Sequence, residues 1–362
     1  MDGFRPHNEA ELVQLLRAPG PAFELAAGGS KRGVGRPVDA PLLDLSGLTG
    51  IIDYAPGELV LTARPATPLA QIEAMLGARR QRLGFEPPAG QTLGGVLMAN
   101  SSGSRRISAG SARDHFLGFR AVNGRGEAFV GGGRVVKNVT GFDLPKALAG
   151  SWGTLAALTE VTVRLVPAAE TESTLLFDCA GVAAAVDLCS QALGSMFEVS
   201  AAAYLPVHGV ALRLEGLAAS VQSRIAGLMP ALGRSAQSLL QAADSALFWR
   251  RIGALEALAD LPVIWRLSVP PREAARVLDA IEPEAFQLDW GGGLICLGAR
   301  RVDAARVRGA LRGGHATLIR ASAAERRANA VFEPLPPALA AIAGRLKAAF
   351  DPDNRLNPGR MD

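Results

Sequence analysis

The sequence predicts an α+β fold with more than one domain, and three observations lead to this expectation. The chain has 362 residues, which suggests two domains at about 150 residues per domain. Apolar residues make up 49% and charged residues 20%, a composition that fits a globular protein and excludes general disorder. After Pro167, segments typical of strands alternate with segments typical of helices, which indicates a sheet with helices on one face.

The first half of the chain is expected to begin with a helix and to continue with short strands. Asn8 is placed to cap a helix with three leucines on one face, and Glu11 occupies its third position. A second helix opens at Pro68, where the fixed φ of proline suits a first turn. Strands are expected at residues 23–27, 42–45, 50–54, 59–63, 119–123, 127–131 and 155–166.

The second half repeats a strand followed by a helix. Strands are expected at residues 210–214, 264–269, 294–298 and 316–320. A helix follows each of the first three strands, as the helical spacing of Val221, Ile225 and Leu228 illustrates. We place the domain boundary at residues 167–172. A last helix is expected at residues 338–349, after the breaker-rich FEPLPPAL.

Scarce cysteine and histidine limit the chemistry. Cys179, Cys189 and Cys296 form no C-x-x-C pair, and the four histidines lie far apart in the sequence. We therefore expect no disulfide framework, metal site or iron–sulfur cluster in this chain, so that any redox cofactor is organic. The net charge of +4 and the 5% aromatic content do not favour nucleic-acid binding.

The sequence lacks the patterns of a membrane-spanning segment and of a signal peptide. We expect a cytoplasmic protein, or one attached peripherally to the inner face of a membrane through partner subunits. Several common catalytic motifs are absent too: the Walker loop, the dinucleotide fingerprint G-x-G-x-x-G, the G-x-S-x-G elbow and H-E-x-x-H. Their absence disfavours an NAD-dependent dehydrogenase and a hydrolase.

Glycine is concentrated in one part of the chain, because 15 of the 41 glycines lie among residues 84–153. Such a density indicates tight turns or close approach of the backbone to a ligand. A separate loop, GGSKRG at residues 28–33, follows an expected strand. Consecutive glycines let backbone N–H groups converge on an anion such as a pyrophosphate, to which Ser30 and Lys31 add donors. A plain surface turn remains the alternative for this loop.

A series of motifs in the first half carries a resemblance to a known family. PAGQTLGG (88–95), MANSSGSRR (98–106), SARD (111–114), VKNVTGFDL (136–144), GSWGTL (150–155) and LTE (158–160) follow one another. In this order they resemble the FAD-binding domain of the vanillyl-alcohol oxidase and p-cresol methylhydroxylase (PCMH) superfamily. More narrowly, the chain is similar to the FAD-binding E subunits of bacterial glycolate oxidases. DWGGGL, GGHAT and the terminal FDPDNRLNPGRM extend the resemblance over nearly the whole chain.

The resemblance implies a domain organisation and a set of FAD-binding residues. A PCMH-type FAD-binding domain of two subdomains would span residues 1–168, an α+β cap or substrate domain 169–330, and 331–362 would return to the FAD domain. The implied FAD-binding residues are Gly28, Gly29, Ser30, Lys31, Arg32, Gly33, Pro88, Thr92, Gly94, Gly95, Ser111, Arg113, Asp114, Lys137, Asn138, Thr140, Gly141, Gly153, Thr154, Leu155, Leu158, Thr159, Glu160 and Asn357.

Within this set the resemblance implies different roles. Residues 28–33 would form a first phosphate loop, and Thr92, Gly94 and Gly95 a second one. Structural roles stay open for some residues: Arg113 and Asp114 as an ion pair that orients a loop, Lys137 as a surface lysine, and Asp143 as a cap.

The sequence also departs from its relatives. Leu155-Ala156-Ala157 stands where the resembling proteins often have a Leu-Gly-Val type of run, which disfavours close backbone approach there. The Glu-His-Gly motif of metal-dependent 2-hydroxy-acid dehydrogenases is absent, and GGHAT (313–317) stands in the corresponding region, so we expect no metal. The first phosphate loop has no histidine, which predicts dissociable FAD.

Two functions are compatible with the resemblance. In the first, the chain oxidises glycolate to glyoxylate, with His315 as base and Arg266 or Arg320 as carboxylate clamp. Structural or solvent-facing positions are the alternative for these three residues. In the second, the chain is a non-catalytic FAD-holding subunit for electron relay or assembly. The resemblance implies a homologous FAD subunit and an iron–sulfur subunit as partners in either case.

Overall fold

The protein is described by a computed structural model that covers residues 4–134 and 142–362. Its described residues divide into two compact units. The first comprises Met1–Ser102, Gly110–Pro167 and Pro334–Asp362, and the second Gly103–Ala109 and Ala168–Glu333. The expected boundaries at 168 and 330 lie close to these. Residues 103–109 differ, because they pack with the second unit although the chain on either side of them belongs to the first.

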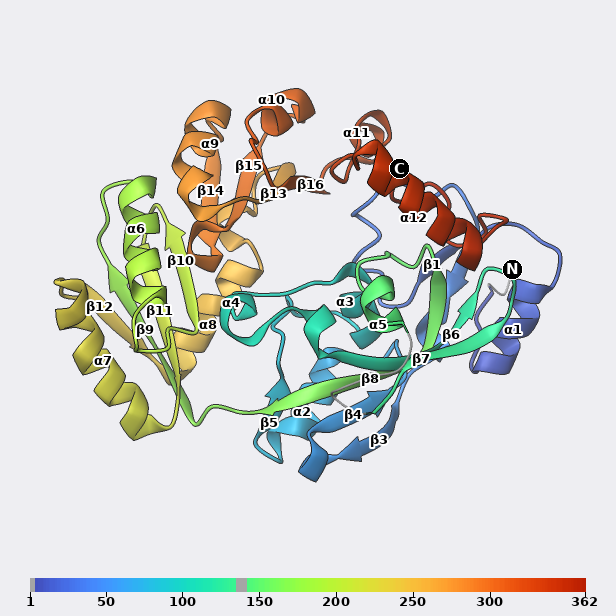
Figure 1. Cartoon of the computed structure of the whole chain (residues 1–362), viewed down its shortest axis with the longest axis horizontal. Helices are drawn as coiled ribbons and strands as arrows, with labels where there is room; N and C mark the ends of the chain where they lie inside the picture. Colours follow the sequence, from blue (N-terminus) through green and yellow to red (C-terminus); the bar gives the residue numbers. More distant parts are fainter. Residues whose placement is uncertain (1–3, 135–141) are drawn as a thin grey trace. The chain divides into compact units, whose positions relative to one another are not determined.

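The first unit contains a two-stranded parallel sheet and a six-stranded antiparallel sheet. The small sheet pairs β1 (Glu24–Ala26) with β2 (Leu42–Asp44). The larger one has the order β3 (Ile51–Ala55), β4 (Val60–Ala63), β8 (Ala156–Pro167), β6 (Phe116–Asn123), β7 (Ala128–Gly132), with β5 (Gln81–Leu83) also on β8. Its helices are α1 (Glu9–Arg17), α2 (Leu69–Gly77), α3 (Leu93–Ala99), α5 (Leu144–Leu148) and α12 (Pro337–Phe350) (Figure 1).

Local sequence explains the first helix and the position of the C-terminal tail. The Asn8 side chain accepts a hydrogen bond from the Glu11 N–H at 2.9 Å, as the capping pattern predicts. Leu12 and Leu16 are buried in one cluster with Phe23, together with Leu356 from the tail. The tail is thereby fixed beside β1, where Phe23 and Leu356 also form a parallel bridge.

The second unit is one eight-stranded sheet whose described pairings are all antiparallel. Its order is β12 (Ser238–Gln241), β9 (Thr171–Phe177), β11 (Gly209–Gly216), β10 (Ala201–Leu205), β14 (Ala285–Asp289), β15 (Leu294–Ala299), β13 (Val263–Ser268), β16 (His315–Arg320) (Figure 1). The helices are α4 (Arg106–Ala109), α6 (Val182–Leu193), α7 (Ala218–Leu232), α8 (Ala242–Gly253), α9 (Ala274–Ile281), α10 (Ala304–Gly309) and α11 (Ala323–Ala328).

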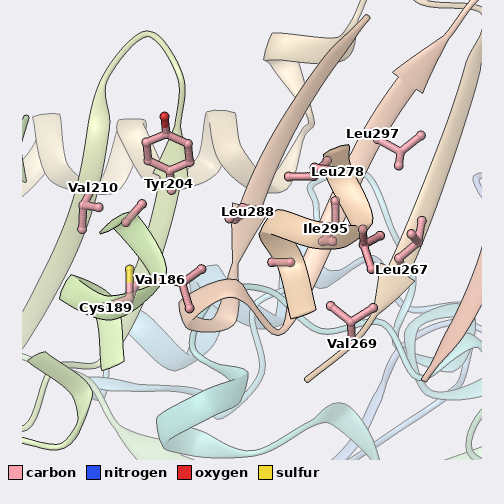
Figure 2. Packing of buried hydrophobic residues seen from close by; sticks show 14 of the residues in the cluster. Val186, Cys189, Tyr204, Val210, Leu267, Val269, Leu278, Leu288, Ile295 and Leu297 are labelled. Carbon is pink, nitrogen blue, oxygen red and sulfur yellow. The ribbon is translucent and has the colours of Figure 1, made fainter. Parts of the chain in front are cut away.

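Helices cover both faces of this sheet, which corrects the expectation of a single covered face. On one face α6, α7, α9 and α10 bury the main core; Figure 2 shows Val186 and Cys189 of α6 with Leu278 of α9 among side chains of the strands. On the other face Trp249 and Ile252 of α8 pack against alternate strand residues such as Ala203. The strand of small residues AAAYL is buried throughout, so its sequence shows no alternation.

Polar contacts explain why residues 103–109 belong to the second unit. Arg105 donates to Glu215 at 2.8 and 2.9 Å and lies 3.5 Å from Glu172. The Ser104 hydroxyl donates to Asp289 at 2.6 Å. These charged and polar groups are largely buried, so the segment is held by satisfied ionic contacts.

Among the helices of the described residues, none is long and apolar enough to cross a membrane.

Candidate functional site

The first unit contains a pocket of about 760 Å³, including the part that opens to solvent. Most of its lining comes from three stretches of chain: β1 with the loop after it, α3 with the Thr92 before it, and the turn at Trp152 with the start of β8. Asn357 and Arg360 of the tail complete the wall. The lining residues are Leu25, Ala26, Ala27, Gly28, Gly29, Ser30, Lys31, Arg32, Leu45, Pro65, Ala66, Thr92, Gly94, Gly95, Met98, Ala99, Trp152, Gly153, Ala156, Ala157, Leu158, Asn357 and Arg360.

The loop at Gly28–Lys31 offers hydrogen-bond donors that the protein does not use. Among the residues described, no acceptor takes the backbone N–H of Gly28, Gly29, Ser30 or Lys31. Gly29 has a φ of 73°, a conformation that glycine adopts without the steric cost of a Cβ. Successive free N–H groups in such a turn form a concave site for an anion.

Lys31 brings a positive charge to the same pocket. Burial lowers the pKa of its ammonium group to about 8. No carboxylate pairs with this group within the described part of the chain. A bound anion would favour the protonated form and raise the pKa, so Lys31 is suited to hold a phosphate at neutral pH.

The neighbouring Arg32 holds the loop in place. Its Nε and Nη2 donate to the two carboxylate oxygens of Glu24 at 2.9 and 2.5 Å. Arg360 lies 3.7 Å from the same carboxylate and donates to the carbonyls of Lys31 and Val34 at 2.7 and 3.1 Å. A buried carboxylate between two arginines fixes the loop geometry. The sequence patterns did not predict Arg360; its place in the terminal LNPGR next to Asn357 is the signal for it.

Thr92, Gly94 and Gly95, which were expected to form a second phosphate loop, line the pocket. The N–H groups of both glycines, however, are bound within the protein. The Thr92 side chain accepts from the Gly95 N–H at 3.3 Å, and the Gly94 N–H donates to the Pro65 carbonyl at 2.7 Å. These N–H groups are therefore not free donors. A Cβ at Gly94 would lie 2.6 Å from the Pro65 Cβ, so glycine here allows two backbone segments to pack closely.

The turn at Trp152 and Gly153 is connected to the C-terminal segment by the side chain of Asn357. Its Oδ1 accepts from the Leu25 N–H at 2.8 Å, and its Nδ2 donates to the Trp152 carbonyl at 2.7 Å. Trp152 and Gly153 both have left-handed φ values, of 54° and 71°. A Cβ at Gly153 would lie 2.8 Å from the Asn357 Nδ2. Asn357 thus positions two walls of the pocket, and both polar ends of its side chain are used within the protein.

Ala156 and Ala157 also line the pocket. Other predicted residues do not line it. These are Gly33, Pro88, Ser111, Arg113, Asp114, Thr154, Leu155, Thr159 and Glu160.

Several polar residues outside the pocket have structural contacts instead. The Asp114 carboxylate accepts from the Ser111 N–H and hydroxyl at 2.7 and 2.8 Å, which caps the short turn Ala112–His115. Thr159 donates to Glu9 at 2.6 Å. Asp143 caps α5, because its side chain accepts a hydrogen bond from the Lys146 N–H at 3.4 Å. The predicted residues Lys137, Asn138, Thr140 and Gly141 lie outside the described residues.

In the second unit, two of the three candidate catalytic residues lie close together. Arg266 on β13 and His315 at the start of β16 occupy neighbouring strands, since Arg266 pairs with Thr317 and Ser268 with His315. Burial lowers the pKa of His315, and the positive charges of Arg266 and Arg106 lower it further, while Glu333 opposes them. The third candidate, Arg320, lies at the opposite end of β16.

Arg320 has a structural role there. Its Nη1 donates to the carbonyls of Leu258, Ala259 and Leu261 at 3.2, 3.1 and 3.3 Å. The structure therefore brings His315 together with Arg266 and not with Arg320. In the chain as described, no three His, Cys, Asp or Glu side chains gather as ligands for a metal ion.

Comparison with known proteins identifies the family. Residues 4–132 match the model of an FAD binding domain. Across 98% of its length the chain is 34% identical to the glycolate oxidase subunit GlcE of Escherichia coli (strain K12), of which it covers 97%. The chain belongs to the GlcE family. It is an FAD-binding protein related to oxidoreductases, and GlcE is by its name one subunit of a larger glycolate oxidase.

Two further similarities extend this result. Over 24% of its length the chain is 42% identical to the glycolate oxidase subunit GlcD of Bacillus subtilis (strain 168), of which this match covers 18%. A xylooligosaccharide oxidase from Myceliophthora thermophila C1 superposes with a TM-score of 0.68 over 99% of this chain and 90% of its own, at 15% identity. The shared fold confirms the expected PCMH-type α+β architecture.

Proposed function

We propose that this chain is the FAD-holding subunit of a complex that oxidises glycolate, or another small 2-hydroxy acid, to the 2-oxo acid. The observation that carries the proposal is the pocket of the first unit. Four N–H groups without a protein acceptor and a partly buried lysine lie together there, and FAD has a pyrophosphate whose oxygens need such donors.

The residues of this pocket fit FAD as a dissociable cofactor. Gly28–Lys31 would bind the pyrophosphate, while Gly94, Gly95 and Ala156 leave room for a flat ring system. The described lining residues include no histidine, cysteine or tyrosine to form a covalent link to the flavin. FAD, when bound, supplies a two-electron acceptor for the hydride that leaves the substrate carbon.

The second unit would supply the groups that act on the substrate. Oxidation of a 2-hydroxy acid breaks its C2–H bond, removes the hydroxyl proton and forms a C=O bond. The lowered pKa of His315 keeps its imidazole neutral at pH 7, so it can accept that proton. The Arg266 guanidinium would hold the carboxylate of the substrate.

An anaerobic titration tests whether this chain is itself catalytic. When the chain is purified alone and loaded with FAD, the flavin absorbance at about 450 nm should fall as glycolate is added, because the flavin is reduced. Bound FAD that stays oxidised would favour the alternative, in which a homologous FAD subunit performs the chemistry and this chain relays electrons or assists assembly. A folded chain that takes up no FAD would contradict both.

The pH profile tests the role of His315. Because the pKa of His315 is lowered, the acid limb of kcat/KM for flavin reduction should lie below the ordinary histidine value of about 6.5. His315→Gln should remove this limb and slow reduction by about a hundredfold or more. His208→Gln serves as a control, since His208 is an exposed histidine of the same unit. An unchanged profile in His315→Gln would rule out His315 as the base.

Partner subunits are part of the proposal. Leu339 and Ile342 on α12 are each about half exposed, as is Leu335 just before the helix, and no residue of α12 is buried. Exposed apolar side chains gathered in one segment are typical of a surface that a partner covers. We propose a homologous FAD subunit and an iron–sulfur subunit as these partners, through which electrons leave and through which the chain is attached peripherally to the membrane.

A further inference from the structure

The outer edge of β16 is closed by the residues that end the second unit. β16 is the last strand of its sheet and pairs with β13 on one side only. On the other side, the Leu318 N–H donates to the Val331 carbonyl at 2.8 Å. Two residues earlier, the Ala316 N–H donates to the Glu333 carboxylate at 2.9 Å. Along the same strand edge, therefore, a backbone carbonyl accepts one hydrogen bond and a charged side chain accepts the other.

The segment that carries Glu333 is held in place by Arg308. The Nε of Arg308 lies 3.5 Å from a carboxylate oxygen of Glu333. Its Nη2 donates to the carbonyls of Ala330 and Phe332 at 2.6 and 3.0 Å. The Cζ of Arg308 lies 5.3 Å from the centroid of the ring of Trp265, which is fully buried. Arg308 thus connects the end of the unit to its core and fixes the position of the carboxylate.

The carboxylate of Glu333 lies close enough to His315 to influence its charge. Burial lowers the pKa of the His315 imidazole most, and the positive charges of Arg266 and Arg106 lower it further. Glu333 supplies the negative charge that raises this pKa. A carbonyl oxygen would satisfy the Ala316 N–H without carrying a full charge. The carboxylate therefore has an electrostatic effect that closing the strand edge does not require.

The backbone of His315 is fixed on both sides. Before it, Gly314 has a φ of 95°, and a Cβ at this position would clash with the Ser268 carbonyl, so β16 begins in close contact with β13. After it, the Ala316 N–H is held by Glu333. Such preorganisation lowers the entropy that a catalytic side chain loses when it reaches its working position.

We propose that Glu333 is a positioning residue for His315, which holds the start of β16 through the Ala316 N–H and stabilises the imidazolium that forms when His315 takes up a proton. This inference rests on the proposed function, in which the proton leaves the substrate hydroxyl for the His315 imidazole. Without the Glu333 carboxylate, the charges that act on His315 within the described chain would be those of Arg266 and Arg106. Both are positive, so proton uptake would become less favourable.

An NMR titration of the histidine Cε1–H signals tests the electrostatic effect without turnover. It uses the full-length FAD-loaded chain with ¹³C-labelled histidine, and the His315 signal is assigned by its loss in His315→Gln. Glu333→Gln keeps an acceptor for the Ala316 N–H but removes the charge, so the pKa of His315 should fall. Glu333→Asp keeps the charge and should recover part of the fall. The control Glu282→Gln removes an exposed carboxylate paired with Arg306 and should leave this pKa unchanged.

Hydrogen exchange followed by mass spectrometry tests the hold on the strand. The Ala316 amide should exchange about tenfold faster in Glu333→Ala, which offers no acceptor, and at nearly the parent rate in Glu333→Gln. Thermal melting and the flavin spectrum of each variant separate this local change from loss of folding. Equal exchange in Glu333→Ala, or an unchanged pKa of His315 in Glu333→Gln, would overturn the proposal.

Flavin reduction by glycolate separates failure of this inference from failure of the proposed function. In Glu333→Gln the rate should fall about tenfold and the acid limb of the pH profile should move to lower pH, because His315 becomes a weaker base. A purely structural role would lower the rate without moving the limb. A lowered His315 pKa in Glu333→Gln, with no flavin reduction in the parent chain, would leave this inference standing and refute catalysis in this chain. Reduction with an unmoved limb in Glu333→Gln would do the reverse.

Discussion

At the scale of single residues, the pocket that we propose for FAD is built by side chains that mostly bind the protein itself. Arg32, Arg360 and Asn357 each satisfy backbone or carboxylate groups that shape the wall. What remains for a ligand is the set of N–H groups at Gly28–Lys31 and the ammonium group of Lys31. Sequence patterns pointed to this loop because consecutive glycines are rare outside special turns. They could not separate its donors from its supports, since that depends on contacts with residues more than 300 positions away.

Lys31 gives the first prediction at this scale. FAD binding should weaken as pH rises above about 8, because the free ammonium group then loses its proton while the bound phosphate favours the charged form. Lys31→Met should weaken binding at pH 7 about tenfold and abolish the pH dependence. Calorimetry on the apoprotein between pH 7 and pH 9.5 measures both effects. Lys146→Met, at a lysine paired with Asp143 on the surface, is the control. A pH-independent affinity in the parent chain would refute the assignment.

Gly153 gives the second prediction at the scale of single residues. Gly153→Ala should destabilise the first unit by about 1–3 kcal/mol and reduce flavin occupancy, because a Cβ there meets Asn357 and the φ of 71° disfavours alanine. Gly33→Ala is the matched comparison: it meets no atom within 4 Å and should keep its flavin. Flavin content after purification and urea unfolding measure the two variants. Equal behaviour of both would contradict the tight packing at Gly153.

At the scale of elements, strands with clear periodicity or strong β-formers were predicted, and small or polar ones were missed. β8 spans Ala156–Pro167, close to the predicted residues 155–166. By contrast, β10 consists of AAAYL and was not predicted, because alanine favours helices and the strand is buried on both faces. α3 was missed too, since LGGVLMA contains two glycines and is held by the Thr92 cap and by packing against Pro65.

At the scale of elements, the prediction concerns the segment Gly103–Ala109. Arg105→Met should lower the unfolding free energy of the second unit by about 3 kcal/mol, since it leaves the buried Glu215 without its partner. Arg105→Lys should recover part of this loss. Differential scanning calorimetry measures the change, with Arg300→Met as a surface control in the same unit. A melting temperature equal to that of the control would show that the buried pair does not hold the segment.

At the scale of the whole molecule, membership of the GlcE family makes assembly the central question. The exposed apolar residues Leu339 and Ile342 of α12 belong to the surface that we propose for a partner. Leu339→Asp combined with Ile342→Asp should leave the melting temperature and FAD content of the isolated chain nearly unchanged, because neither residue is buried. Co-purification with the partner subunits should be lost. Intact assembly would show that the partners bind elsewhere, and Met196→Asp, at another exposed apolar residue, is the control.

Through its resemblance to known FAD-binding proteins, the sequence by itself indicated the cofactor class and the family, and its glycines marked residues 28–33 as a candidate anion-binding loop. These features depend on short-range backbone requirements and on residue types, which a linear pattern preserves. Only the tertiary structure decided that Arg106 joins Arg266 and His315 around Trp290, and that Arg320 does not. Residue 106 is 160 positions from residue 266, so their proximity follows from long-range packing and buried ionic contacts rather than from any local pattern. The scarcity of cysteine and histidine could be read directly from the sequence, whereas the neighbouring positions of Arg266 and His315 required the fold.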